Sequence, residues 1–310
     1  MTLTLVPLLL VLALGTGWVA DRCLARAAWQ AAAPSRALWT WHAAALTFVS
    51  SLTAAAVLLA HDVLERALLT LTAVPKERLH VAYAGPREID GLWNLTALLV
   101  LVGAIALVRR AITTRKAAAA TQARLDAHPT TPGHSGFGTI DVSDSTDLYA
   151  FSTPARTRRA SSTSVVVSRG VLQQLSHDQV DAVLAHEFSH VRRHHHRQVA
   201  GAEIIAGVVG LSGALASYPG QVRRLVEMQA DDDAAAATSR RSVARALFRM
   251  SETATPGLAM STGSTADRVH RLLDNRPTLA KRRQATWAVA SFVPLVLVPP
   301  LCVIAPLLLV

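Results

Sequence analysis

Leu184-Ala185-His186-Glu187-Phe188-Ser189-His190 (184–190) is the stretch around which the rest of the chain is organised. On a helix, His186 and His190 lie one turn apart on the same face, so their imidazoles can converge on one zinc ion. Glu187 follows the first histidine, where its carboxylate can serve as the general base of a zinc-dependent hydrolysis. Because the chain has 12 histidines, a chance match is the alternative, and the surrounding sequence must decide between the two.

The sequence before the motif favours a helix. Ser176-His177-Asp178-Gln179 fits a capping box, with Ser176 as the N-cap and Gln179 reaching back to it. Apolar side chains then recur at helical spacing, at Val180, Val183, Leu184, Phe188 and Val191. The motif is therefore predicted to lie well inside a helix, which is the context that a zinc site of this kind requires.

The composition is typical of a membrane protein. Hydrophobic residues make up 51% of the 310 residues, charged residues make up only 17%, and the mean hydropathy is +0.31. The net charge of +10 would suggest nucleic acid as a partner of a soluble protein. Here the basic residues flank apolar runs and no nucleic-acid fold signature is recognisable, so no direct nucleic-acid partner is expected.

Cys23 and Cys302 form no CxxC pair, and we assign them no metal or disulfide role.

Four apolar runs are long enough to cross about 30 Å of hydrocarbon. They cover residues 3–20, 41–60, 92–108 and 285–309. A signal peptide is the alternative for the first run, but no basic region and no clear cleavage site accompany it, so a retained span is favoured. Four prolines in the last run would kink a helix without preventing a span.

The basic residues predict the orientation of these spans. They gather after the first run, after the third run and before the fourth, whereas the loop 61–91 has mixed charge. The positive-inside rule then places the N-terminus outside the cell and residues 109–284 in the cytoplasm. The expected location is therefore the cell (inner) membrane, with the motif on the cytoplasmic side.

These features predict a mainly α, polytopic helical membrane protein with a cytoplasmic, zincin-like α+β metallopeptidase domain. The expected parts are three spans in 1–112, a linker in 113–138, the peptidase domain in 139–284 and the last span in 285–310. Within the peptidase domain, segments 148–153 and 164–168 have strand composition and are separated by polar turn residues, which suggests a β-hairpin.

A catalytic zinc site needs a third protein ligand. His194 lies on the helical stripe of the two motif histidines, but about 12 Å along the axis from His186, which is too far to share one ion. His194, His195 and His196 are therefore expected to be solvated or interfacial. Glu203 is a further candidate, but it falls inside an apolar run.

Glu227 and Asp231 are the better candidates, because carboxylates at i and i+4 share one face of a helix. One of them can ligate the metal while the other accepts the N–H of a ligating imidazole. An acidic helix surface is the alternative. The apolar segment 199–217 cannot then cross the membrane once, because His186 and Glu227 would end on opposite sides. It is predicted to be a buried helix or a membrane-embedded hairpin bent near its glycines.

The motifs together resemble a known family. HEFSH (186–190), EMQAD (227–231), Tyr149-Ala150-Phe151 and VVVSRGVL (165–172) resemble BlaR/MecR-type antirepressor zinc peptidases, and they are similar to the related HtpX and CAAX-prenyl protease gluzincins. Two features depart from these families. The 310 residues contain no stretch expected to form a large penicillin-binding domain, and one apolar run, rather than two spans, separates the HExxH motif from the expected third ligand.

The resemblance implies roles for single residues. His186, His190 and Glu227 would be the ligands of Zn2+, Glu187 the general base, and Asp231 the partner that orients a ligating histidine. The strand 164–168, with Val165, Val166 and Val167, would be the edge to which an extended substrate adds.

The resemblance also implies a donor that stabilises the oxyanion, supplied by a later segment of the chain. Arg268 and His270 are the candidates for this donor, and a surface cation is the alternative for Arg268.

The implied activity is that of an integral membrane zinc metalloendopeptidase acting on a cytoplasmic or membrane-associated protein. Regulatory cleavage of a winged-helix transcriptional repressor is the leading hypothesis. The alternatives are an HtpX-type quality-control protease and a non-catalytic membrane scaffold with a structural metal site. Glu187 argues against the scaffold, because a structural zinc site needs no base.

The predicted orientation is testable with a reporter fused near residue 130. A reporter that works only in the cytoplasm should be active there, because the third span would return the chain to the cytoplasm. Accessibility of the fused reporter to a membrane-impermeant label in intact cells would contradict the predicted topology.

Overall fold

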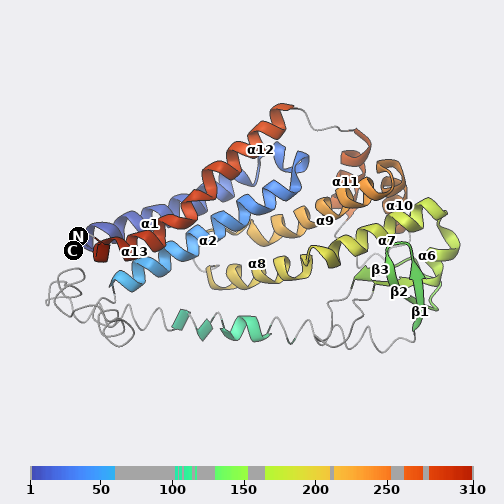
Figure 1. Cartoon of the computed structure of the whole chain (residues 1–310), viewed down its shortest axis with the longest axis horizontal. Coiled ribbons are helices and arrows are strands. Elements are labelled where there is room, and N and C mark those ends of the chain that lie inside the picture. The colour runs from blue at the N-terminus through green and yellow to red at the C-terminus, as the bar shows by residue number, and fades with distance from the viewer. Residues whose placement is uncertain are drawn as a thin grey trace.

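The computed structural model shows a mostly helical, elongated protein with one small sheet (Figure 1). It describes residues 2–59, short stretches between 102 and 116, and residues 130–152, 165–209, 213–252, 262–274 and 279–308.

Among the described residues, three helical segments have the length and composition of membrane spans, at Leu5–Leu24, Pro34–Leu58 and Arg283–Ile304. They consist of α1 (Thr2–Val19) with the π-helical turn η1 (Ala20–Leu24), of α2 (Pro34–Leu59), and of α12 (Leu279–Phe292) with η6 (Pro294–Leu297) and α13 (Val298–Leu308). The 3-10 turn η2 (Ala28–Ala32) joins the first two. The first, second and fourth predicted runs are thus confirmed as long apolar helices, and the predicted run 92–108 lies largely outside the described residues.

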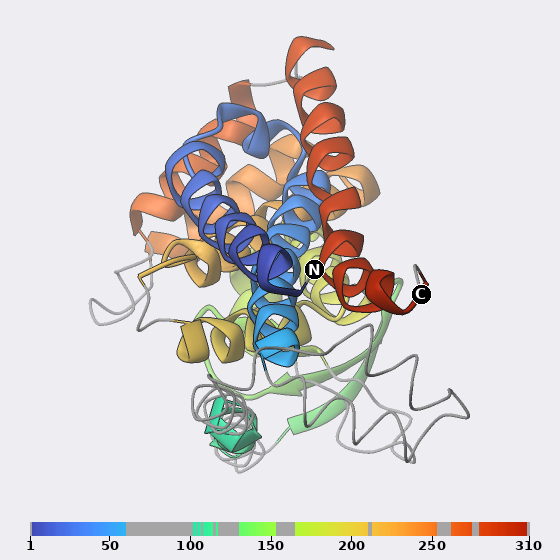
Figure 2. The ribbon, with the colours of Figure 1, turned by 90° about the vertical axis from the view of Figure 1, so that its left-hand side faces the viewer.

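The candidate membrane helices and the motif-bearing helices share one hydrophobic core. α1, α2 and the α12–α13 pair pack side by side at one end of the molecule, where both chain ends also lie (Figures 1 and 2). Trp41 and Phe48 of α2 are fully buried in the same cluster as Tyr218, Val222 and Leu225 of α9 (Tyr218–Ala237). Residues from both sides of the predicted domain boundaries therefore pack into a single core.

The sheet lies at the opposite end of the molecule from the chain ends (Figure 1). Its strands β1 (Thr130–Ser135), β2 (Gly138–Ser143), β3 (Ala150–Ser152) and β4 (Val165–Ser168) are arranged in the order β1-β2-β4-β3. β4 runs parallel to β2 and antiparallel to β3, with Ala150 opposite Val167 and Phe151 opposite Val166. The predicted pairing of the two strand segments is confirmed.

Two predictions about the sheet need correction. The strand with Val165, Val166 and Val167 is not an edge, because β2 pairs with one side of it and β3 with the other. A continuous apolar run is typical of such an interior strand. The predicted linker 113–138 also ends early, because β1 begins at Thr130; Pro132 fits there because an outer strand tolerates the loss of an N–H donor.

Six helices complete the motif-bearing part. They are α6 (Arg169–Gln174), α7 (His177–Arg192), α8 (His195–Val209), α9, α10 (Arg240–Glu252) and α11 (Thr262–Asp274). α7 carries the whole HExxH motif, and its start has the predicted cap: Gln179 Oε1 accepts from the Ser176 N–H at 2.9 Å.

The segment 199–217 does not form one long helix. α8 ends at Val209, Gly213 adopts a left-handed φ of 67°, and α9 runs back beside α8 (Figure 1). An ion pair between Glu203 and Arg223 joins the two helices. The chain therefore makes a helical hairpin here. This arrangement is compatible with the prediction that the segment does not cross the membrane.

A residue of the first membrane segment caps the helix that carries Glu227. The two carboxylate oxygens of Asp21 accept from the backbone N–H groups of Ala216 at 3.1 Å and Ser217 at 3.0 Å, just before α9 begins. A carboxylate at this place pairs otherwise unsatisfied donors and interacts favourably with the helix dipole. Asp21 thereby connects the start of α9 to the first candidate membrane helix.

Substitution Asp21→Ala should lower the free energy of unfolding by about 1 kcal/mol, as expected for loss of a helix cap. Thermal unfolding of the detergent-solubilised protein measures this as a lower midpoint. Asp144→Ala is the control, because Asp144 forms only an exposed ion pair with Arg169 and should change little. Equal midpoints for the two variants would exclude Asp21 as the anchor of α9.

Candidate metal centre

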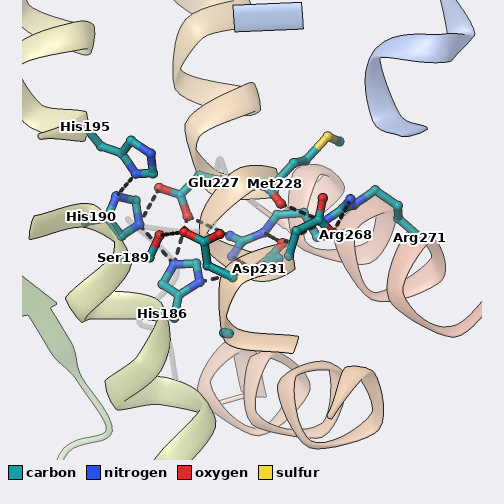
Figure 3. A network of polar contacts seen from close by, with 12 residues as sticks. His186, Ser189, His190, His195, Glu227, Met228, Asp231, Arg268 and Arg271 are labelled. Carbon is teal, nitrogen blue, oxygen red and sulfur yellow. Dashed lines mark hydrogen bonds and ion pairs between the residues drawn. The ribbon is translucent and has the colours of Figure 1, made fainter. Parts of the chain in front are cut away.

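The two motif histidines converge on one carboxylate. α7 directs His186 and His190 toward Glu227 of α9 (Figure 3). The Nε2 atoms of the two histidines lie 3.1 Å apart. The carboxylate oxygens of Glu227 lie 3.4 Å from His186 Nε2 and 3.5 Å from His190 Nε2. Among the described residues, these three form a cluster that could hold a metal ion.

These spacings are close to those of the ligands around one ion. Ligand atoms bonded at about 2.0–2.1 Å to a tetrahedral ion lie about 3.3–3.4 Å from one another. The two Nε2 atoms lie 3.1 Å apart, and each faces a different oxygen of Glu227, at 3.4 and 3.5 Å. With one ligand atom taken from each residue, all three atoms lie within 4.8 Å of one another. Two imidazole nitrogens and one carboxylate oxygen are a ligand set that suits zinc. The side chain of Glu227 is 38% exposed, so solvent reaches the cluster from its side.

The charges around the cluster favour a cation. Burial alone would raise the pKa of Glu227, but His186, Arg268 and His190 lower it to about 2. Burial alone would lower the pKa of His186, but the carboxylates of Asp231 and Glu227 raise it to about 10. Burial and the charge on His186 lower the pKa of His190 to about 3. The two acids thus favour a positive charge between them, which suits a metal ion at this place.

Glu187 lies next to the cluster and contacts the sheet. Its carboxylate lies near the backbone N–H and the hydroxyl of Ser152, the last residue of β3, and both favour its charged form. Removal from water raises the pKa of Glu187, with the charge of His186 acting in the opposite direction. A carboxylate with a raised pKa is suited to taking up and returning a proton.

Asp231 lies behind His186, on the side away from the cluster. Its Oδ1 is 3.2 Å from His186 Nδ1, in an ion pair rather than a hydrogen bond of good geometry, and its side chain is fully buried. Arg268 holds the same carboxylate through two hydrogen bonds of 2.8 and 2.7 Å. Burial alone would raise the pKa of Asp231, but Arg268 and His186 keep it well below its usual range. The carboxylate of Glu227 therefore faces both His186 and His190, whereas the carboxylate of Asp231 faces His186 alone.

The two residues considered as oxyanion donors lie differently. Arg268 is largely buried, and its Nη1 lies 3.0 Å from Glu227 Oε2, so its guanidinium bridges Glu227 and Asp231 (Figure 3). His270 is exposed on α11. The structure therefore places Arg268 as a clamp on two acidic side chains, and His270 away from them on the solvent side.

His195 is the residue that sequence reasoning missed. It was expected to be solvated or interfacial, but it is only 1% exposed, and its Nδ1 lies 3.0 Å from His190 Nδ1. The prediction placed His186, His190 and His194 on one helical stripe, whereas α7 ends at Arg192 and His194 has a left-handed φ of 53°. That break turns His195 back toward His190. His194 and His196 are exposed, as expected.

Comparison with known proteins gives two matches. Residues 113–285, more than half of the chain, match the model of peptidase family M48. A stretch of 56 residues is 45% identical to Protease HtpX of Tolumonas auensis and covers 18% of each chain, so the match spans less than a fifth of that curated relative. No solved structure matches the chain.

Arg268→Met should lower the free energy of unfolding by about 3–5 kcal/mol, because it leaves a fully buried carboxylate without its main ion partner. Adding Asp231→Asn should recover part of this loss, since the uncompensated charge is removed. Denaturant unfolding of the solubilised protein measures both effects. Arg169→Met, which breaks only an exposed pair, is the control. A single Arg268 variant as stable as this control would contradict the clamp.

Proposed function

Because the chain belongs to peptidase family M48, we propose that it is an integral membrane zinc metalloendopeptidase. The observation that carries this proposal is the convergence of His186, His190 and Glu227, whose ligand atoms lie within 4.8 Å of one another, with Glu187 next to His186 in the chain. The three long apolar helices support a membrane protein. The core that α2 shares with α9 holds the candidate metal centre against these helices.

Zn2+ would be held by His186, His190 and Glu227. When bound, it polarises the scissile carbonyl and makes a water molecule more acidic. Glu187 takes the proton of the attacking water and returns it to the amine that leaves. Ser152, whose N–H and hydroxyl lie near the carboxylate of Glu187, would help to orient it. Asp231 orients His186 so that Nε2 faces the other ligands.

The substrate would bind along β3. Among the described strands β3 pairs only with β4, and its last residue, Ser152, contacts Glu187. A peptide that adds to β3 as a further strand gains main-chain hydrogen bonds and passes next to the general base. In this arrangement Val165, Val166 and Val167 support β3 from inside the sheet rather than touching the substrate.

The substrate class is a cytoplasmic or membrane-associated protein. Regulatory cleavage of a winged-helix transcriptional repressor remains the hypothesis from the antirepressor-like motifs, and the cytoplasmic side follows from the basic flanks of the spans. Quality control of membrane proteins is the second candidate, and the partial match to Protease HtpX supports a membrane metallopeptidase without deciding between the two. A neighbouring gene for a winged-helix repressor would favour the first candidate over the second.

Glu187→Gln should leave zinc binding intact and reduce proteolysis by about 10²–10⁴-fold, because the amide cannot take up the proton. Metal analysis gives the zinc content of the purified variant. Comparison of new protein N-termini in cells with the native chain and in cells with the variant gives the loss of cleavage.

Glu203→Gln is the matched control, since this carboxylate pairs with Arg223 between α8 and α9 and is not part of the cluster. It should retain both zinc and proteolysis. Full cleavage by the Glu187→Gln enzyme would remove Glu187 from the mechanism.

A further inference from the structure

The second motif histidine is backed by a chain of side chains that leads to a membrane helix. His190 Nδ1 lies 3.0 Å from His195 Nδ1, and His195 Nε2 lies 3.0 Å from Gln229 Oε1. Gln229 Nε2 in turn donates to Ser35 Oγ at 2.6 Å. Ser35 belongs to the first turn of α2, so the chain runs from the metal centre to the start of a candidate membrane span.

The amide at the far end of this chain fixes the direction of every hydrogen bond in it. Gln229 Oε1 only accepts, so the Nε2 of His195 must carry the proton and donate. The Nδ1 of neutral His195 is then an acceptor, and His190 must donate to it from Nδ1. The remaining nitrogen of His190, Nε2, is left with a free lone pair. That nitrogen is the one that faces Glu227 and His186.

Burial makes this direction hard to reverse. His195 is 1% exposed and Gln229 is 6% exposed, so water cannot readily replace either partner. The rings of His190 and His195 meet edge to face, with their centroids 4.8 Å apart. A buried polar group left without its partner is destabilising, which penalises the other tautomer of His195.

We propose that His195 is a positioning residue that holds His190 in the tautomer and orientation needed to bind the metal, and that Gln229 sets the tautomer of His195. The inference rests on the proposed metallopeptidase function. His195 would thus orient His190 as Asp231 orients His186. The orienting group is a neutral imidazole in the first case and a carboxylate in the second.

The test measures the apparent zinc dissociation constant of the metal-depleted, full-length protein in detergent, by competition with a chromophoric chelator. His195→Leu should weaken zinc binding about 10–100-fold, the usual effect of losing a group that orients a ligand. His195→Asn should recover most of the affinity, because its amide oxygen can still accept from His190 Nδ1. His196→Ala, at the exposed neighbouring position, should bind zinc like the native chain.

The comparison of Leu with Asn separates positioning from packing. Leu fills the buried space but accepts no hydrogen bond, whereas Asn is smaller and does accept one. Native affinity in the Leu variant, or equal weakening in the Leu and Asn variants, overturns the inference. If the Leu variant does not fold, Gln229→Met removes the acceptor that sets the tautomer of His195, and native affinity there overturns it equally.

The two proposals fail in different ways. A native chain that binds no zinc overturns the proposed function, and this inference with it. A native chain that binds zinc, together with variants that bind it equally well, overturns the role of His195 alone.

Discussion

The metal centre depends on the packing of α9 along α7, since its ligands come from both helices and lie far apart in the chain. Asp233 fixes the register of this contact. Its carboxylate accepts from Ser189 Oγ at 2.6 Å and from two nitrogens of Arg193 at 2.6 and 2.8 Å. Burial alone would raise the pKa of Asp233, but these partners lower it to about 2, so the clamp stays ionised. Sliding either helix by one turn would separate Glu227 from both histidines by about 5 Å.

The same contact joins the candidate metal centre to the candidate membrane helices. α9 packs on α7 with one part of its surface and on α2 with another, and Asp21 holds its first turn. The path from His190 through His195 and Gln229 reaches α2 a second time. A displacement of α2 would therefore disturb both the helix that carries Glu227 and the chain of hydrogen bonds behind His190. In this architecture the candidate membrane helices both hold the site in place and support its geometry.

The sequence was sufficient where the information is local. The HExxH spacing, the cap at Ser176 and the i, i+4 spacing of Glu227 and Asp231 each depend on a single helix, and the structure has all three features. It was insufficient where partners come from distant segments. The interior position of β4 depends on β2, and a strand with the composition of β1 was predicted as a linker. The burial of His195 depends on a helix break that no glycine or proline marks.

The central claim is that the paired histidines and one glutamate from a second helix bind a single metal ion. An anomalous-diffraction map of the zinc-loaded protein, recorded at the zinc absorption edge, tests it most directly. The expected result is one peak about 2.0–2.1 Å from Nε2 of His186 and of His190, and about 2.0–2.2 Å from a carboxylate oxygen of Glu227. A peak bound by other side chains, or one that leaves Glu227 outside the coordination sphere, would contradict it.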